Sequence, residues 1–168
     1  MQVESTPIVD AVCSKAPSCR REIFESTLAL AIELAQEGRE GHPLGALFTL
    51  GSAEAVMACS RPLILDPLSG HTPAATHITD RRLRGTIKEL AQLDGAFVVA
   101  DDGIVVAACR YLDVPAEGIS VPLGLGSRHV AAAAVSRLSD VVAIVVSASG
   151  ALRVFCHGEL WAEVEHCR

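Results

Sequence analysis

The chain has 168 residues, half of them hydrophobic and one fifth charged, which suits one domain with a sizeable core. Its formal net charge is -6, and its aromatic residues are four Phe, one Tyr and one Trp. The absence of a basic stripe and of a base-stacking surface argues against nucleic acid as a partner. A small phosphorylated ligand stays compatible with this composition, because it needs only local positive charge.

Neither a membrane segment nor a metal-binding motif is recognisable. No apolar run approaches the roughly 18 residues of a membrane-spanning helix, and the first 19 residues contain no apolar signal-peptide core. We therefore expect a cytoplasmic chain that does not contact a membrane. The six cysteines are scattered without a CxxC pair, and the six histidines lack a spacing such as HExxH. This pattern favours buried free thiols over a zinc site.

Residues 1–16 show no clear hydrophobic period and are predicted to form a loose arm, followed by a single domain over residues 17–168. The first half of that domain is predicted to hold a helix, a strand, a short helix, an ordered loop and a longer helix. Their ranges, in chain order, are 17–38, 43–50, 54–60, 61–80 and 83–92. Gly45, inside the strand, indicates close approach by another backbone. His71 and His77, in the loop, are either solvated or turned toward a ligand.

The second half is predicted to be richer in strands. Asp101-Asp102-Gly103 is typical of a hairpin turn, and the run of six apolar residues at 141–146 indicates a central strand covered on both faces. The predicted strands are 93–100, 104–109, 141–146 and 151–156, with a loop over 113–122, a helix after Ser127 and a closing segment over 160–168. This order predicts an α/β (α+β) fold with a mixed, mainly antiparallel central sheet flanked by helices.

Residues 123–138 combine a glycine-rich turn with a strong helix former. Two glycines open the stretch, Ser127 is a residue type favoured at a helix N-cap, and an alanine-rich run follows. Arg128 and His129 are then expected in the first helical turn, where free N–H groups and the helix dipole favour an anion. The stretch predicts a phosphate site, with an ordinary capped helix as the alternative.

Asp94 is the carboxylate best placed for chemistry. It lies where a predicted helix ends and a predicted strand starts, and Gly95 and Ala96 leave space beside it. A carboxylate at a strand edge can bind Mg²⁺ or Mn²⁺, or accept a proton from a hydroxyl. An Asp-Gly pair in this position also occurs as a simple turn. Beside a phosphate loop, however, Asp94 becomes a candidate metal ligand for phosphoryl or nucleotidyl transfer.

Taken in order, these segments resemble the diadenylate cyclase domain family. The resemblance rests on Asp94-Gly95-Ala96 before a hairpin, Tyr111-Leu112, Gly126-Ser127-Arg128-His129 opening an alanine-rich helix, and Val145-Val146-Ser147 before a glycine-containing turn. It covers residues from about 20 to 160, and the chain resembles the stand-alone, soluble branch of the family. A chance match by an unrelated α/β domain is the remaining alternative.

The resemblance implies that two ATP molecules condense to cyclic di-AMP and two pyrophosphates, each 3′-hydroxyl attacking the α-phosphate of the facing nucleotide. It implies that Asp94, with Gly95 and Ala96 beside it, activates the hydroxyl and holds Mg²⁺ or Mn²⁺. The implied ATP contacts are Leu112 at the adenine, Gly126, Ser127, Arg128 and His129 at the triphosphate, and Ser147 near the phosphates. Because the two nucleotides must face each other, two copies of the domain must associate with opposed sites.

Two positions depart from the family pattern. Val130 stands where the family often has a second arginine after Arg-His. Ala148 and Ser149 stand where the family usually places an acidic residue after the Val-Val-Ser strand. The alternative function is therefore a catalytically weak or silent module that binds ATP or cyclic di-AMP as a regulator.

Overall fold

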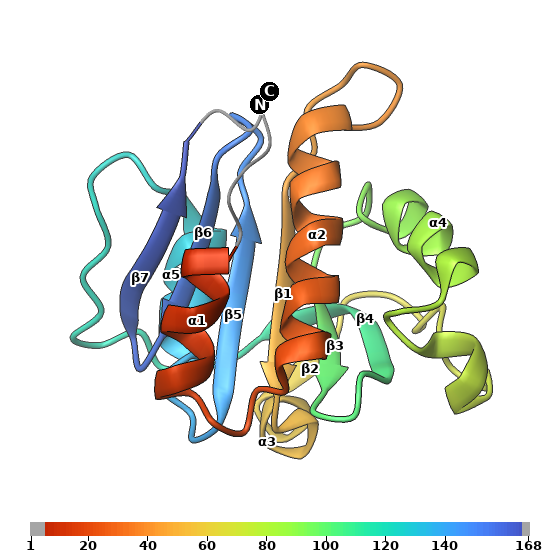
Figure 1. Cartoon of the computed structure of the whole chain (residues 1–168), viewed down its shortest axis with the longest axis horizontal. Helices are drawn as coiled ribbons and strands as arrows, with labels where there is room; N and C mark the ends of the chain where they lie inside the picture. Colours follow the sequence, from red (N-terminus) through yellow and green to blue (C-terminus); the bar gives the residue numbers. More distant parts are fainter. Residues whose placement is uncertain (1–5, 166–168) are drawn as a thin grey trace.

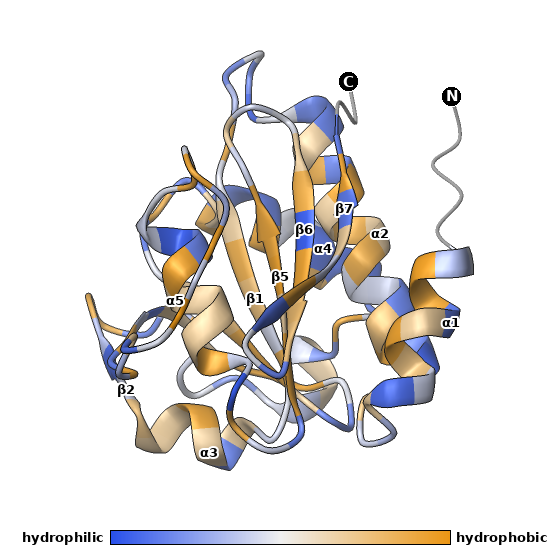
Figure 2. Ribbon diagram, turned by 90° about the vertical axis from the view of Figure 1, so that its left-hand side faces the viewer, coloured by the Kyte–Doolittle hydropathy of each residue, from blue (hydrophilic) through white to orange (hydrophobic). Residues whose placement is uncertain are grey.

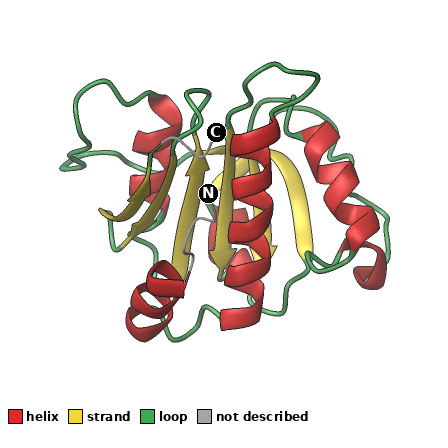
Figure 3. Cartoon of the chain, turned by 45° about the horizontal axis from the view of Figure 1, so that its top comes forward, coloured by secondary structure: helices red, strands yellow, loops and turns green. Residues whose placement is uncertain are grey.

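The architecture is a seven-stranded sheet with helices on both faces, seen in a computed structural model that describes residues 6–165 (Figures 1 and 3). The helices are α1 (Thr6–Lys15), α2 (Arg21–Glu37), α3 (Ala53–Ala58), α4 (Arg81–Leu90) and α5 (Ser127–Val135), with a short 3₁₀ turn η1 (Pro73–Thr76). The strands are β1 (Ala46–Gly51), β2 (Ser60–Pro62), β3 (Ala96–Ala100), β4 (Val105–Leu112), β5 (Val141–Val146), β6 (Leu152–Cys156) and β7 (Glu159–Val164).

The strand order is β2-β4-β3-β1-β5-β6-β7. Among these strands β1 pairs with β3 in parallel, and the other neighbours are antiparallel. The predicted mixed, mainly antiparallel sheet flanked by helices is therefore confirmed. Within 6–165, no helix is both long enough and apolar enough to cross a membrane.

The core lies in two layers, one on each face of the sheet. Alternate residues of β5 show this: Val142, Ile144 and Val146 belong to the layer beneath α1, α2 and α4, whereas Val141, Ala143 and Val145 belong to the layer beneath α3 and α5. In Figure 2 the central strands β1 and β5 are coloured mainly orange, which marks hydrophobic residues. Full burial of one Val or Ile side chain contributes about 1.5–3 kcal/mol, which explains why a wholly apolar strand occupies this central position.

The N-terminal segment differs from the prediction. The loose arm expected over residues 1–16 is wrong for Thr6–Lys15, which form α1, while residues 1–5 lie outside the described range. Val9 and Val12 of this helix are buried in the core, and Lys15 Nζ lies 4.7 Å from the centroid of the Trp161 ring. Two valines three residues apart are too short a stripe to indicate a helix by themselves. The single domain over 17–168 stays a prediction.

The other elements follow the predicted order, with shifted boundaries. The loop expected over 61–80 also contains the end of β2 and the turn η1. The predicted closing segment over 160–168 contains most of β7, and residues 166–168 lie outside the described part of the chain.

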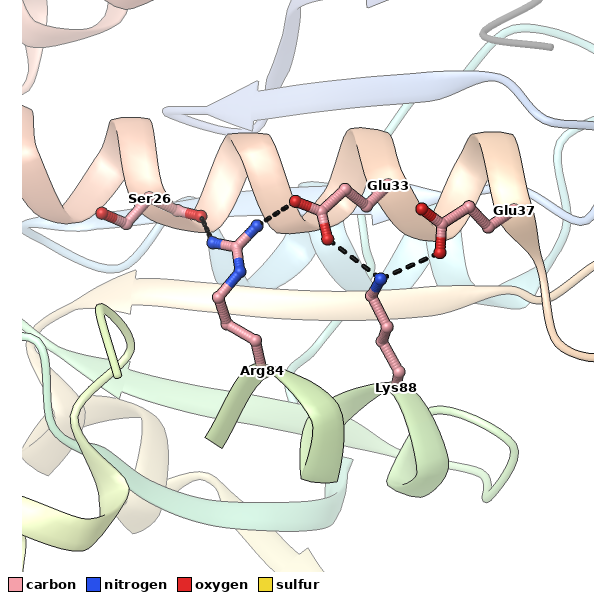
Figure 4. A network of polar contacts seen from close by, with 5 residues as sticks. All are labelled: Ser26, Glu33, Glu37, Arg84 and Lys88. Atoms are coloured by element: carbon pink, nitrogen blue, oxygen red, sulfur yellow. Dashed lines mark hydrogen bonds and ion pairs between the residues drawn. The ribbon is translucent and has the colours of Figure 1, made fainter. Parts of the chain in front are cut away.

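Helix α4 is tied to α2 by an ion-pair network (Figure 4). Arg84 pairs with Glu33 and donates to the carbonyl of Ser26, while Lys88 Nζ lies 3.0 Å from Glu33 and 2.9 Å from Glu37. Burial acts to raise the pKa of Glu33, but the hydrogen bond from Lys88 and the charge of Arg84 outweigh it, and the pKa lies below its ordinary value. The network thus favours the ionised carboxylate.

We expect Glu33→Gln to lower the free energy of unfolding by about 1 kcal/mol at pH 7, because these side chains are partly exposed and their attraction is screened. The pKa of Glu33 is lower in the native state than in the unfolded chain. The stabilisation is therefore present above pH 4.5, its ordinary pKa, and is lost as the pH falls through the native pKa.

Urea unfolding of both proteins at pH 7 and pH 3.5 measures this contribution, and the difference between them should shrink at pH 3.5. The matched control is Glu117→Gln in an exposed loop, with an expected change within about 0.5 kcal/mol. Equal losses in the two variants would contradict a specific role for the network.

Candidate active site

The starts of β1 and β3 and the end of β5 meet at one edge of the sheet. β1 and β3 are parallel, and continuing their register backwards places Gly45 level with Asp94. β5 runs antiparallel to β1 and pairs its last residue, Val146, with the first residue of β1. Ser147 therefore follows at the same edge. The topology brings three segments that are distant in sequence to one place.

Helix α5 begins beside this edge. Its N-cap is Gly126, with extended backbone angles and no side-chain capping bond, and Ser127 is the first helical residue. The prediction that Ser127 caps the helix is therefore wrong by one position. Arg128 and His129 are the second and third helical residues, so they do lie in the first turn, as predicted. The N–H group of His129 donates to the carbonyl oxygen of Gly126 at 3.0 Å, so the N–H groups of Ser127 and Arg128 are the ones without an acceptor inside the helix, and they keep the environment favourable to an anion.

Arg128 reaches Asp94 across the edge. Its Nη2 lies 3.3 Å from Asp94 Oδ1, which also accepts from the backbone N–H of Gly95 at 2.9 Å. Both side chains face solvent, at 39% and 81% exposure. This contact joins Asp94 to the predicted phosphate site at the start of α5.

Gly45 makes room for the guanidinium. A Cβ at this position would lie 2.3 Å from Arg128 Nη1 but 3.4 Å from the carbonyl oxygen of Val146, an ordinary contact. The predicted close approach at Gly45 is confirmed, but the predicted neighbour is wrong. The group that approaches most closely is the side chain of Arg128 and not a backbone.

Gly95 is required by the strand behind Asp94. Its φ is +105°, and a Cβ would lie 2.5 Å from the carbonyl carbon of Cys109 on β4. The register of β3 against β4 shifts between Ala96 and Val98, so the strands bulge at this point. Ala96 itself is buried and starts β3. Gly95 therefore allows β4 to pass close behind the carboxylate.

Two hollows meet at Arg128. The first, of about 160 Å³, is lined by Leu47, Leu63, Asp94, Gly95, Ala96, Arg110, Tyr111, Leu112, Ser127, Arg128 and Ala131. The second, of about 210 Å³, is lined by Gly126, Ser127, Arg128, His129, Val145, Val146, Ser147 and Ala148. Ser127 and Arg128 line both. All the site residues predicted from the sequence therefore lie in one continuous region, although their individual roles remain predictions.

Several residues of the first hollow were not anticipated. Leu63, Arg110 and Ala131 carry no recognisable motif, and Tyr111 entered only as the neighbour of Leu112. The Tyr111 ring is 46% exposed and lies 4.5 Å from Arg61 Cζ. The apolar lining gives the first hollow a different character from the second, which is formed by a helix start and a turn.

His129 differs from an exposed phosphate ligand. Its side chain is 6% exposed, stands edge-on to Phe155, and has Nε2 3.3 Å from Arg153 Nη1. Burial and the positive charges of Arg153 and Arg128 lower the pKa of His129 below its ordinary value. His129 is therefore neutral at pH 7, and the positive charge at the mouth of the second hollow comes from Arg128. No sequence signal marked Arg153 beyond its presence inside an otherwise apolar strand.

The turn after β5 closes the second hollow. Ser147 Oγ accepts from the backbone N–H of Ser149 at 3.3 Å and lies 3.0 Å from its hydroxyl oxygen. Ala148 lies between these serines and lines the hollow. Ser147 thus lines the same hollow as the start of α5, and its role near the phosphates stays a prediction.

His71, His77 and Cys19 line neither of the two hollows, whereas the backbone of Cys109 lies against Gly95. His71 is exposed, and both ring nitrogens of His77 are within 2.9 Å of oxygens of Thr79 and Asp102, which indicates a structural role. The cysteines in the described range are free thiols, as predicted, and Cys167 lies outside it. Burial raises the pKa of Cys19 to about 12. Residues 6–165 contain no group of three or more His, Cys, Asp or Glu side chains that could hold a metal ion by themselves.

Two solved structures have similar folds. One is a hypothetical membrane spanning protein from Bacillus cereus, with a TM-score of 0.61 and 24% identity, covering 83% of this chain and 62% of that chain. The other is a double mutant of DacA from Staphylococcus aureus, with a TM-score of 0.57 and 21% identity, covering 83% of this chain and 85% of that chain. At these identities the likeness shows a shared fold.

Sequence comparison shows the family. Two curated relatives named diadenylate cyclase are 41% identical to this chain: one from Methanocaldococcus jannaschii over 147 residues and one from Haloferax volcanii over 150 residues. The matches cover 87% and 89% of this chain but 46% and 53% of the relatives, so the chain spans about half their length. A family model described as DisA bacterial checkpoint controller nucleotide-binding, abbreviated DAC, matches residues 33–160. Since that match covers most of the sequence, this chain belongs to the DAC family.

Proposed function

We propose that this chain is a diadenylate cyclase, a nucleotidyltransferase that condenses two ATP molecules into cyclic di-AMP and releases two pyrophosphates. The observation that carries the proposal is the contact between Arg128 and Asp94 at the junction of the two hollows. It joins a cation and a carboxylate at the start of a helix. The names of the two relatives support the same activity.

The two hollows suit different parts of ATP. The triphosphate occupies the second hollow, between the start of α5 and the turn at Ser147, where backbone N–H groups and Arg128 attract anions. The adenine occupies the first hollow, against Leu112 and the Tyr111 ring. Arg128, which lines both, then lies near the α-phosphate, with Asp94 beside it.

Members of this family are generally metal-dependent, and the donor set here fits an ion shared with the substrate. Asp94 supplies one exposed carboxylate, whose bonds from Gly95 and Arg128 both go to Oδ1. Mg²⁺ is commonly held by one or two carboxylates together with phosphate oxygens. Mg²⁺ or Mn²⁺ would thus be held by Asp94 and the triphosphate, where it offsets phosphate charge.

The residues of the chain account for the remaining chemistry. Asp94 accepts the proton of a ribose 3′-hydroxyl, whose oxygen attacks the α-phosphate of the facing ATP. A bond from phosphorus to the 3′-oxygen forms, the bond to pyrophosphate breaks, and a second such step closes the ring. Arg128 stabilises charge on the reacting phosphate. One domain binds one nucleotide, so we propose that two protomers associate with opposed sites.

The test is to incubate the purified protein with ATP and Mg²⁺ or Mn²⁺ and to measure cyclic di-AMP by mass spectrometry. We expect product, and we expect the specific activity to fall on dilution as opposed protomers separate. Activity that stays constant down to a proven monomer would contradict the opposed arrangement. The expected cytoplasmic location and the absence of nucleic-acid and membrane partners stay predictions.

The second candidate is a silent module that binds ATP without turnover. Ala148 favours this candidate, because it lines the second hollow and offers no acidic side chain there. Binding of ATP with no product under either metal would support this candidate. Appearance of product in Ala148→Glu would then identify the missing acid as the cause.

A further inference from the structure

We propose that Arg153 is a positioning residue for the phosphate site, because its guanidinium, paired with Glu163, holds a neutral His129 in one tautomer and so fixes the first turn of α5. That turn carries Arg128 toward Asp94. The part of this proposal that concerns ATP rests on the proposed function. The tautomer of His129 does not depend on any reaction.

Arg153 is an unusual residue for its place in the fold. It lies in β6, whose five residues are all buried, and it is 8% exposed itself. Its backbone partner on β7 is Glu163, and the two side chains form an ion pair. A charge removed from water needs such a partner. The pairing leaves the Nη1 group free to point at His129, at 3.3 Å from Nε2.

The chemistry of the two groups fixes the tautomer. A guanidinium has only donors, so His129 Nε2 must accept from Arg153. An imidazole that accepts at Nε2 and is neutral carries its hydrogen on Nδ1. A protonated His129 would instead place two cations within 3.3 Å of each other. Arg153 therefore selects the neutral ring with hydrogen on Nδ1.

This bond ties the buried side of the helix start to β6. The N-cap Gly126 makes no side-chain capping bond, and α5 packs on the sheet mainly through Ala132, Ala133 and Val135. Such small side chains define the position of a helix poorly along its own axis. His129 is adjacent to Arg128, so a shift of the first turn would move the guanidinium away from Asp94.

Stability alone does not explain the network. His129 Nδ1 and Arg153 Nε are buried without a hydrogen-bond partner in the described structure. Unpaired buried polar atoms cost folding free energy, and replacing both members of a buried ion pair with apolar side chains is often neutral or stabilising. Apolar side chains at positions 153 and 163 together would therefore serve the fold as well as this ion pair does. A positioning role accounts for the charge.

The test compares wild type with Arg153→Met, which keeps the volume of the side chain and removes its donors. In the wild type without ATP, ¹⁵N NMR at pH 7.5 should show His129 with hydrogen on Nδ1, and the variant should lose this fixed pattern. The affinity for α,β-methylene-ATP, which cannot release pyrophosphate, should fall about 10- to 100-fold, with KM rising more than kcat falls. The unfolding midpoint is expected to fall, because Glu163 loses its partner, so the tautomer and the affinity are measured where both proteins are folded.

Arg153→Lys retains a donor and should restore the tautomer pattern and most of the affinity. The matched control, Arg81→Met, removes the same charge from an exposed site at the start of α4 and should change none of these values. If Arg153→Met does not fold, Glu163→Gln provides the test, with a smaller loss in the same direction.

Hydrogen on Nε2 of His129 in the wild type, or unchanged affinity in the variant, would overturn the proposal. The tautomer and the affinity need no turnover, so their failure is distinguishable from absence of cyclase activity.

Discussion

Asp94→Asn is expected to lower cyclic di-AMP formation about 10²- to 10⁴-fold, the range typical of a lost general base, while the fold is retained. The side chain is largely exposed, and an asparagine Oδ1 can accept the same hydrogen bonds from Gly95 and Arg128. What disappears is the negative charge. Without it the residue can neither take the proton of a 3′-hydroxyl nor share a divalent cation with the triphosphate.

The measurement is the initial rate of product formation by mass spectrometry, at saturating ATP and with each metal, together with the urea unfolding midpoint. Asp101→Asn is the matched control, since Asp101 is exposed in the turn between β3 and β4. The control should retain wild-type activity. Turnover by Asp94→Asn at the wild-type rate would remove Asp94 from its proposed role.

The elements that the sequence predicted well have strong local signals. The strand β5 is a continuous apolar run, and its predicted range of 141–146 matches the structure. The helix after the glycines is displaced by a single residue at its start. Asp94 and the segment from Gly126 to His129 were expected to meet on the basis of the family resemblance. The structure places them together because β1 and β3 start at the same sheet edge.

What could not be predicted depends on partners distant in the chain. The valines of α1 form an obvious apolar face only once the sheet beneath them is known. Arg153 has no local signal for burial, because its counter-charge lies on β7 and its neighbour His129 on α5. Gly45 signalled close contact, but only the fold identifies the contacting group as Arg128.

Gly45→Ala is expected to lower kcat/KM about 10- to 100-fold with little effect on stability. The added Cβ would lie 2.3 Å from Nη1 and 3.2 Å from Cζ of Arg128, so the guanidinium must move. It is the far end of a flexible, partly exposed side chain, and its relocation into solvent costs little folding free energy. The relocation does, however, break the contact with Asp94 and withdraws positive charge from both hollows.

The control for this substitution is Gly85→Ala, at an exposed position inside α4 where a Cβ would meet no atom within 4 Å. It should leave activity unchanged and raise the free energy of unfolding by about 0.5–1 kcal/mol, since alanine favours the helix. For Gly45→Ala, urea unfolding should change by less than about 1 kcal/mol while the ATP KM rises. Wild-type KM and kcat in Gly45→Ala would show that Arg128 need not occupy the space beside residue 45 for the site to work.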